Sequence, residues 1–93
     1  MSTEQEKFFT LLNQYPNLAV CWNEQKREIR PRMINRTNAL ASTGEKVILA
    51  CLQCIWYGQA SDSGTFIDIT QLAQLSDQYK RPIVEWLINP FWP

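Results

Sequence analysis

The chain has no histidine, only three cysteines and no apolar run long enough to cross a membrane. Histidine is the usual general base and the commonest metal ligand in proteins, so its absence argues against catalysis and against a bound metal. An odd number of cysteines cannot form a complete set of disulfides within one chain, and it suits a reducing compartment. The apolar segment from Val47 to Tyr57 is about half as long as the ~20 residues that a membrane span needs. We therefore expect a soluble cytoplasmic protein with no enzymatic activity, no cofactor and no membrane contact.

Charge of one sign is not in excess either. Nine basic residues balance nine acidic ones, so the molecule as a whole has no net attraction for nucleic acid or membranes. The N-terminus is polar and lacks the basic start and apolar core of a signal peptide. A length of 93 residues and an apolar content of 45% are typical of one globular domain. We predict a single domain over residues 1–93.

The segment from Ser42 to Gly58 carries the strongest helical signal in the chain. Ser42 and Glu45 form a Ser-x-x-Glu capping box at its start, and glycine at its end suits the left-handed conformation that follows many helices. Between these ends, only Lys46 and Gln53 interrupt an otherwise apolar or small run. A helix that is apolar on nearly all sides must be covered on nearly all sides. We predict a central buried helix over Thr43–Tyr57.

Capping residues, prolines and apolar spacing predict further helices around this one. They span about residues 3–15, 31–41, 69–75 and 77–88, with Pro16 ending the first and Pro82 lying inside the last. The short apolar run within residues 17–28 does not distinguish a strand from a helical turn, and we favour a turn or a short helix there. The predicted fold is all-α, with four or five short helices packed around the central one.

The C-terminal tail carries two large aromatic residues, Phe91 and Trp92. Exposure of such side chains to water forfeits roughly 2–3 kcal/mol each, so we expect the tail to fold back onto the domain. The expected receiving surfaces are the central helix near Trp56 and Tyr57 and the first helix at Phe8 and Phe9. The alternative is a mobile hook that binds a partner. Trp92 and Trp22 are the tryptophans that we consider for a functional surface.

The segment from Lys26 to Arg36 is the most basic part of the chain. It holds five basic residues and one acidic residue, a local net charge of +4, so the rest of the chain carries −4. Forked arginine donors match carboxylates and phosphates. The segment can therefore bind an acidic protein or a nucleic-acid backbone, or it can be a solvated face with no ligand. The candidate partner-binding residues are Lys26, Arg27, Arg30, Arg32, Arg36 and Trp92.

Two other patterns carry a possible function. Residues 68–75 and 77–88 resemble a helix-turn-helix, with Lys80 and Arg81 early in the second helix, but the usual turn glycine is absent and Pro82 interrupts that helix. Cys51 and Cys54 match the C-x-x-C spacing of thiol oxidoreductases and zinc sites. They lie well inside the predicted central helix, which favours apolar packing over redox chemistry.

Three classes of function follow from these patterns. We favour a small interaction or regulatory module that binds another protein, and the partners that we consider are an acidic protein and a second copy of the chain. The alternatives are a nucleic-acid-binding protein that uses residues 26–36 or the C-terminal hairpin, and a redox or metal-binding protein that uses Cys51 and Cys54.

Overall fold

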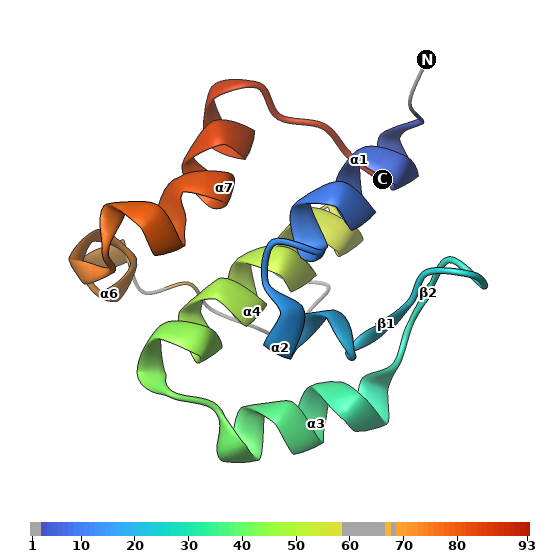
Figure 1. The fold of residues 1–93 in the computed structure, drawn as a ribbon, viewed down its shortest axis with the longest axis horizontal. Helices are drawn as coiled ribbons and strands as arrows, with labels where there is room; N and C mark the ends of the chain where they lie inside the picture. The colour runs from blue at the N-terminus through green and yellow to red at the C-terminus, as the bar shows by residue number, and fades with distance from the viewer. Residues whose placement is uncertain (1–2, 59–66, 68) are drawn as a thin grey trace.

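A computed structural model describes residues 3–58, 67 and 69–93, and α4 (Thr43–Tyr57) runs through the middle of the arrangement (Figure 1). The side chain of Ser42 accepts a hydrogen bond from the backbone N–H of Glu45 at 3.2 Å, and the Glu45 carboxylate accepts one from the N–H of Ser42 at 3.0 Å. Gly58 ends the helix with a φ of 81°. Most of α4 is buried, with Ile48, Leu49 and Leu52 fully enclosed. The predicted central helix is therefore confirmed.

The N-terminal segment forms two helices, α1 (Glu4–Leu12) and α2 (Pro16–Ala19). The Thr3 hydroxyl caps α1 by accepting the N–H of Glu6 at 3.1 Å. The sequence predicts one helix that ends at about Tyr15, but α1 ends at Leu12 and Pro16 begins α2. Proline suits a first helical position because its missing N–H would have no partner there. This short helix brings the number of helices in the described residues to six, which is five around α4 and agrees with the predicted four or five.

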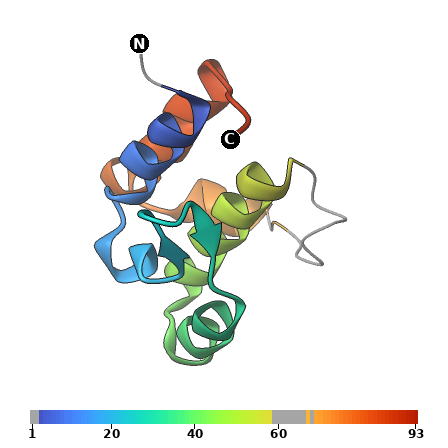
Figure 2. The ribbon, with the colours of Figure 1, turned by 90° about the vertical axis from the view of Figure 1, so that its right-hand side faces the viewer.

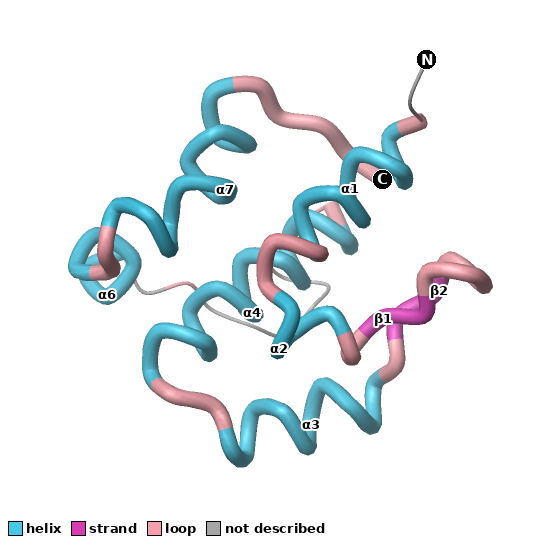
Figure 3. The backbone as a smooth tube through the Cα atoms, viewed as in Figure 1, coloured by secondary structure: helices cyan, strands magenta, loops and turns pink. Residues whose placement is uncertain are grey.

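A small antiparallel hairpin follows, made of β1 (Trp22–Asn23) and β2 (Glu28–Ile29) (Figure 3). Trp22 pairs with Ile29 and Asn23 pairs with Glu28. The connecting turn places Arg27 at a φ of 56°, in the left-handed region. Our prediction of a turn or short helix over residues 17–28 is right for α2 and misses the hairpin. An apolar run this short carries no period that separates the two structures.

The hairpin leads directly into α3 (Pro31–Leu40), close to the predicted bounds of 31–41. Pro31 occupies the first turn, and α3 reaches the core through Ile34, which is buried, and Met33, which is half-buried. The spacing of Leu40 from Met33 and Ile34 predicts that it lies on the apolar face of this helix, but it is 89% exposed. The chain turns into an extended conformation at the next residue, and this last turn of α3 therefore remains in solvent.

The C-terminal helices are α6 (Ile69–Gln74) and α7 (Asp77–Ile88). In sequence, Asp68 is suited to cap α6 and residues 59–65 are typical of a loop, but these residues lie outside the described part of the chain. Ser76 caps α7 as predicted, by accepting the N–H of Tyr79 at 3.3 Å. Pro82 lies within α7, which is helical from end to end. The Tyr15 hydroxyl donates to the carbonyl of Tyr79 at 2.7 Å and ties α7 to the N-terminal segment.

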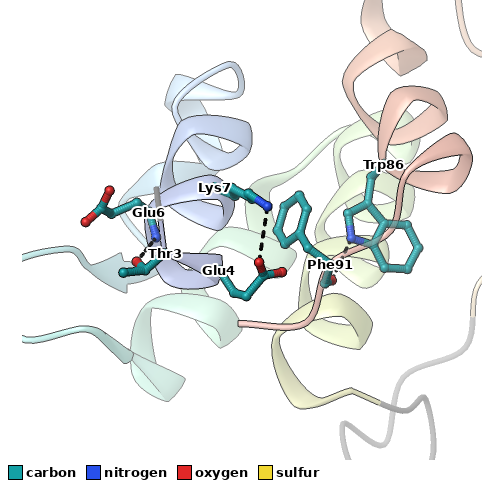
Figure 4. Close-up of polar contacts among 6 residues, drawn as sticks. All are labelled: Thr3, Glu4, Glu6, Lys7, Trp86 and Phe91. Atoms are coloured by element: carbon teal, nitrogen blue, oxygen red, sulfur yellow. Dashed lines mark hydrogen bonds and ion pairs between the residues drawn. The ribbon is translucent and has the colours of Figure 1, made fainter. Parts of the chain in front are cut away.

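The C-terminal tail folds back, but onto α7 itself. The indole Nε1 of Trp86 donates a hydrogen bond to the carbonyl of Phe91 at 2.9 Å (Figure 4). The ring of Trp86 also meets the rings of Phe91 and Trp92 edge to face. Of the surfaces that we predicted for the tail, Phe8 and Phe9 pack against Trp56, while Phe91 lines a groove with Lys7 of α1.

Seen from the side, α7 lies at one end of the molecule and α3 at the other (Figure 2). The described residues thus form a mostly helical domain around α4, and the all-α prediction is confirmed. The basic segment and the aromatic tail, both singled out from the sequence, are kept apart by this arrangement.

Candidate functional site

A groove of about 590 Å³ opens on the surface where β2 passes into α3. Three arginines of the basic segment, Arg30, Arg32 and Arg36, line it. The remaining lining comes from Glu28, Ile29, Pro31 and Met33. The structure therefore gathers three of the six predicted partner-binding residues around one hollow.

The local backbone explains why these arginines converge. Arg30 is the residue before the first turn of α3, and Pro31 holds the chain in the helical conformation from there on. Arg32 and Arg36 are four residues apart on α3, so their side chains lie on the same face of the helix. Arg30 is also anchored, because its Nη1 donates to the carbonyl of Val20 at 3.3 Å.

The groove has a net positive charge, because three arginines and one carboxylate, Glu28, line it. The two ion pairs within the described part of the chain, Lys7–Glu4 and Lys80–Asp77, lie elsewhere. Arg32 and Arg36 are exposed and make no side-chain hydrogen bond or ion pair with any described residue. Like charges at this helical spacing destabilise the helix slightly. A bound anion would relieve that repulsion.

Apolar side chains form the floor of the groove. Ile29 and Met33 are half-buried and pack against the main hydrophobic core. The Cys21 thiol lies 3.7 Å from the carbonyl of Met33 and 3.4 Å from the hydroxyl of Thr37, which holds α3 against the preceding turn. The sequence predicts the arginines of the groove, whereas the apolar floor was not predicted. The pattern that could have indicated the floor is the alternation of arginine with Ile29 and Met33 along residues 29–33.

The other two basic candidates lie outside the groove. The guanidinium of Arg27 sits over the ring of Phe9 at 5.6 Å, and Arg27 lines a separate depression with Glu6 and Glu24. Lys26 lies in the hairpin turn, where its backbone N–H donates to the Oδ1 of Asn23 at 3.1 Å. These two residues contribute positive charge near the groove but do not form its wall.

The two tryptophans that the sequence suggested for a functional surface differ sharply. Trp22 is 4% exposed and belongs to an aromatic cluster with Phe8 and Trp56. Trp92 is 54% exposed and lies beside Trp86, away from the arginines. The sequence did not predict a second groove, between α1 and α7, whose lining includes Lys7, Trp86 and Phe91. Trp92 lines neither this groove nor the one formed by the arginines.

The environment of Cys51 does not favour thiol chemistry. Burial, followed by the neighbouring Cys54, raises the pKa of the Cys51 thiol to about 12. A reactive cysteine needs the opposite shift, since the thiolate is both the nucleophile and the metal ligand. Within residues 3–58, 67 and 69–93, no three His, Cys, Asp or Glu side chains gather in a way that could hold a metal ion.

The C-terminal helical pair offers few basic groups to nucleic acid. Lys80 donates from its Nζ to the carbonyl of Ala73 at 2.9 Å and lies 4.0 Å from a carboxylate oxygen of Asp77. Its charge is thereby used to join α6 to α7. Arg81 is the remaining exposed cation of the would-be recognition helix.

Comparisons of the chain with protein-family models, with curated proteins and with solved structures found no match. The described helices include none with the length and apolar character required to traverse a bilayer. The fold and the groove thus define a small, mostly helical domain with a basic surface hollow.

Proposed function

We propose that the protein is a small cytoplasmic interaction module, without chemistry of its own, that binds an acidic segment of another protein. The observation that carries this proposal is the convergence of Arg30, Arg32 and Arg36 on one groove in which no described carboxylate pairs with them. Carboxylates fit this site because a guanidinium binds a carboxylate through two parallel hydrogen bonds. Positive grooves also raise association rates with negatively charged partners.

The apolar floor favours a protein over a nucleic acid as the ligand. Ile29 and Met33 can contact the side chains of a peptide, whereas a phosphate backbone leaves such a surface uncovered. Nucleic-acid binding relies chiefly on many lysine and arginine contacts to phosphates. The groove provides three arginines on a molecule whose total charge is zero.

Charge reversal of the groove tests this function. The variant R30E/R32E/R36E should keep the fold, because exposed charges contribute little to stability. A fluorescent eight-residue peptide that alternates Val and Glu serves as the acidic probe, and its binding is measured by anisotropy at low and moderate salt. We expect the triple variant to lose binding by at least about tenfold, as expected when charge-assisted hydrogen bonds are replaced by repulsion.

The matched control reverses three exposed basic residues that lie elsewhere, as K7E/K46E/R81E. It changes the net charge by the same amount and should bind the peptide nearly as well as the wild type. Equal loss in both triple variants would show that only net charge matters and would contradict the proposed site. Tighter binding of a DNA duplex of similar charge than of the peptide would favour the nucleic-acid function.

A further inference from the structure

The backbone of β2 has an unused edge beside the arginines. The N–H of Arg30 donates to the carbonyl of Cys21 at 2.8 Å. In an antiparallel pair, hydrogen-bonded and non-hydrogen-bonded residue pairs alternate along the strands. Ile29 is the next residue along β2 and pairs with Trp22. The N–H and C=O of Ile29 therefore point away from β1.

This outward edge has no described partner, and the residue that carries it lines the groove. Ile29 belongs to the groove lining and is half-buried. Its N–H and C=O make no backbone hydrogen bond with any residue in the described part of the chain. A strand edge of this kind is a template for another strand.

We propose that the partner binds as an extended acidic segment that adds a third strand to the hairpin at Ile29. The Ile29 N–H would donate to a carbonyl of the segment, and the Ile29 carbonyl would accept an N–H from it. Strand addition of this type uses main-chain hydrogen bonds for affinity and side-chain contacts for specificity. Arg30, Arg32 and Arg36 supply the charge complementarity that selects an acidic segment over a neutral one.

The inference deepens the proposed function and rests on it, because it names the conformation in which the acidic partner binds. A helical acidic segment could also reach the arginines, but the backbone groups in its interior are paired within the helix, so it cannot lie along β2 and bond to Ile29 as a strand does. An extended partner is therefore expected to form a hydrogen bond with the Ile29 amide, and a helical partner is not.

Hydrogen exchange of the wild-type protein tests the inference directly. The probe is the eight-residue Val–Glu peptide used above, and the readout is the exchange rate of the Ile29 amide by NMR. At saturating peptide the exchange of this amide should slow on the order of tenfold or more, because a new hydrogen bond protects it. Unchanged exchange at Ile29 with the peptide bound would overturn the inference.

Two substitutions at the same position give an independent test. Ile29→Pro removes the outward N–H, and proline is tolerated at edge positions whose N–H is not used by the sheet. Ile29→Ala retains the N–H and also loses the side-chain contacts, so it is the matched control. We expect the proline variant to bind the peptide about threefold to tenfold more weakly than the alanine variant, the range expected for one lost hydrogen bond. Equal affinities would contradict strand addition.

A modified probe separates this inference from the function on which it rests. Methylation of alternate backbone nitrogens in the Val–Glu peptide removes its strand donors and keeps every carboxylate. Loss of binding by this probe supports strand addition. Retained binding that R30E/R32E/R36E still abolishes would overturn strand addition alone, whereas binding of the parent peptide that is insensitive to R30E/R32E/R36E would overturn the proposed function.

Discussion

Replacement of Phe91 by alanine should lower the melting temperature, although this residue is third from the C-terminal end. Its ring is half-buried and meets the ring of Trp86 edge to face at 6.4 Å. Its carbonyl accepts the Trp86 indole N–H at 2.9 Å. The side chain thus fastens the tail to α7 and covers part of the hydrophobic core.

The size of the effect follows from the exposure of the ring. Truncation of a fully buried phenylalanine costs about 3–5 kcal/mol. A half-buried ring should therefore cost roughly 1–2 kcal/mol on the same scale. In a domain of this length each kcal/mol corresponds to about 4–8 °C in melting temperature. We expect Phe91→Ala to melt about 5–15 °C below the wild type.

Thermal unfolding followed by circular dichroism measures this shift. Leu40→Ala is the control, because this side chain is 89% exposed and should contribute less than about 1 kcal/mol. If Phe91→Ala melts within about 2 °C of the wild type, the tail does not support the fold. That result would favour the alternative in which the aromatic tail is a hook for a partner.

Three further measurements probe other parts of the fold. Leu49→Asp should abolish cooperative unfolding, because Leu49 is fully buried in α4 and an unpaired core charge costs several kcal/mol. Lys46→Asp, on the exposed side of the same helix, should retain cooperative unfolding. Equal melting temperatures of the two variants would refute the central position of α4. The pKa of Cys51 is raised from 9.0 to about 12 in the folded protein, so the thiol of the unfolded chain loses its proton first as the pH rises. The free energy of unfolding should therefore fall between these pH values by up to about 1.4 kcal/mol per pH unit. Cys51→Ala should reduce this pH dependence, as measured by urea titrations at several pH values. Arg27 has a φ of 56°, so Arg27→Val should be less stable than Arg27→Asn by about 1 kcal/mol, because both variants lack the guanidinium and only Asn tolerates the left-handed backbone. Equal stability of the two variants would mean that the hairpin turn has another conformation.

The boundaries of α4 could be predicted closely because they depend on neighbours in the sequence. Ser42 and Glu45 exchange hydrogen bonds across three residues, and Gly58 takes the left-handed conformation at the other end. Such contacts form in the same way whatever surrounds the helix. The cap of α7 at Ser76 was predictable for the same reason.

The sequence also identified the arginines but not the site that they form. A run of basic residues shows that positive charge is concentrated, and it leaves open which side chains point together. Arg27 turns toward Phe9, whereas Arg30, Arg32 and Arg36 share a groove. The difference depends on where the hairpin ends and α3 begins.

Only the tertiary structure decided the pairing of β1 with β2 and the receiving surface of the tail. Each involves contacts whose formation depends on what other segments have already covered. Trp56 packs against Phe8 and Phe9, while the tail meets Trp86. Leu40 shows the converse, since its spacing predicts burial and yet it is 89% exposed. Capping is a local interaction that the sequence specifies by itself, while burial is a competition among distant segments for the same surface.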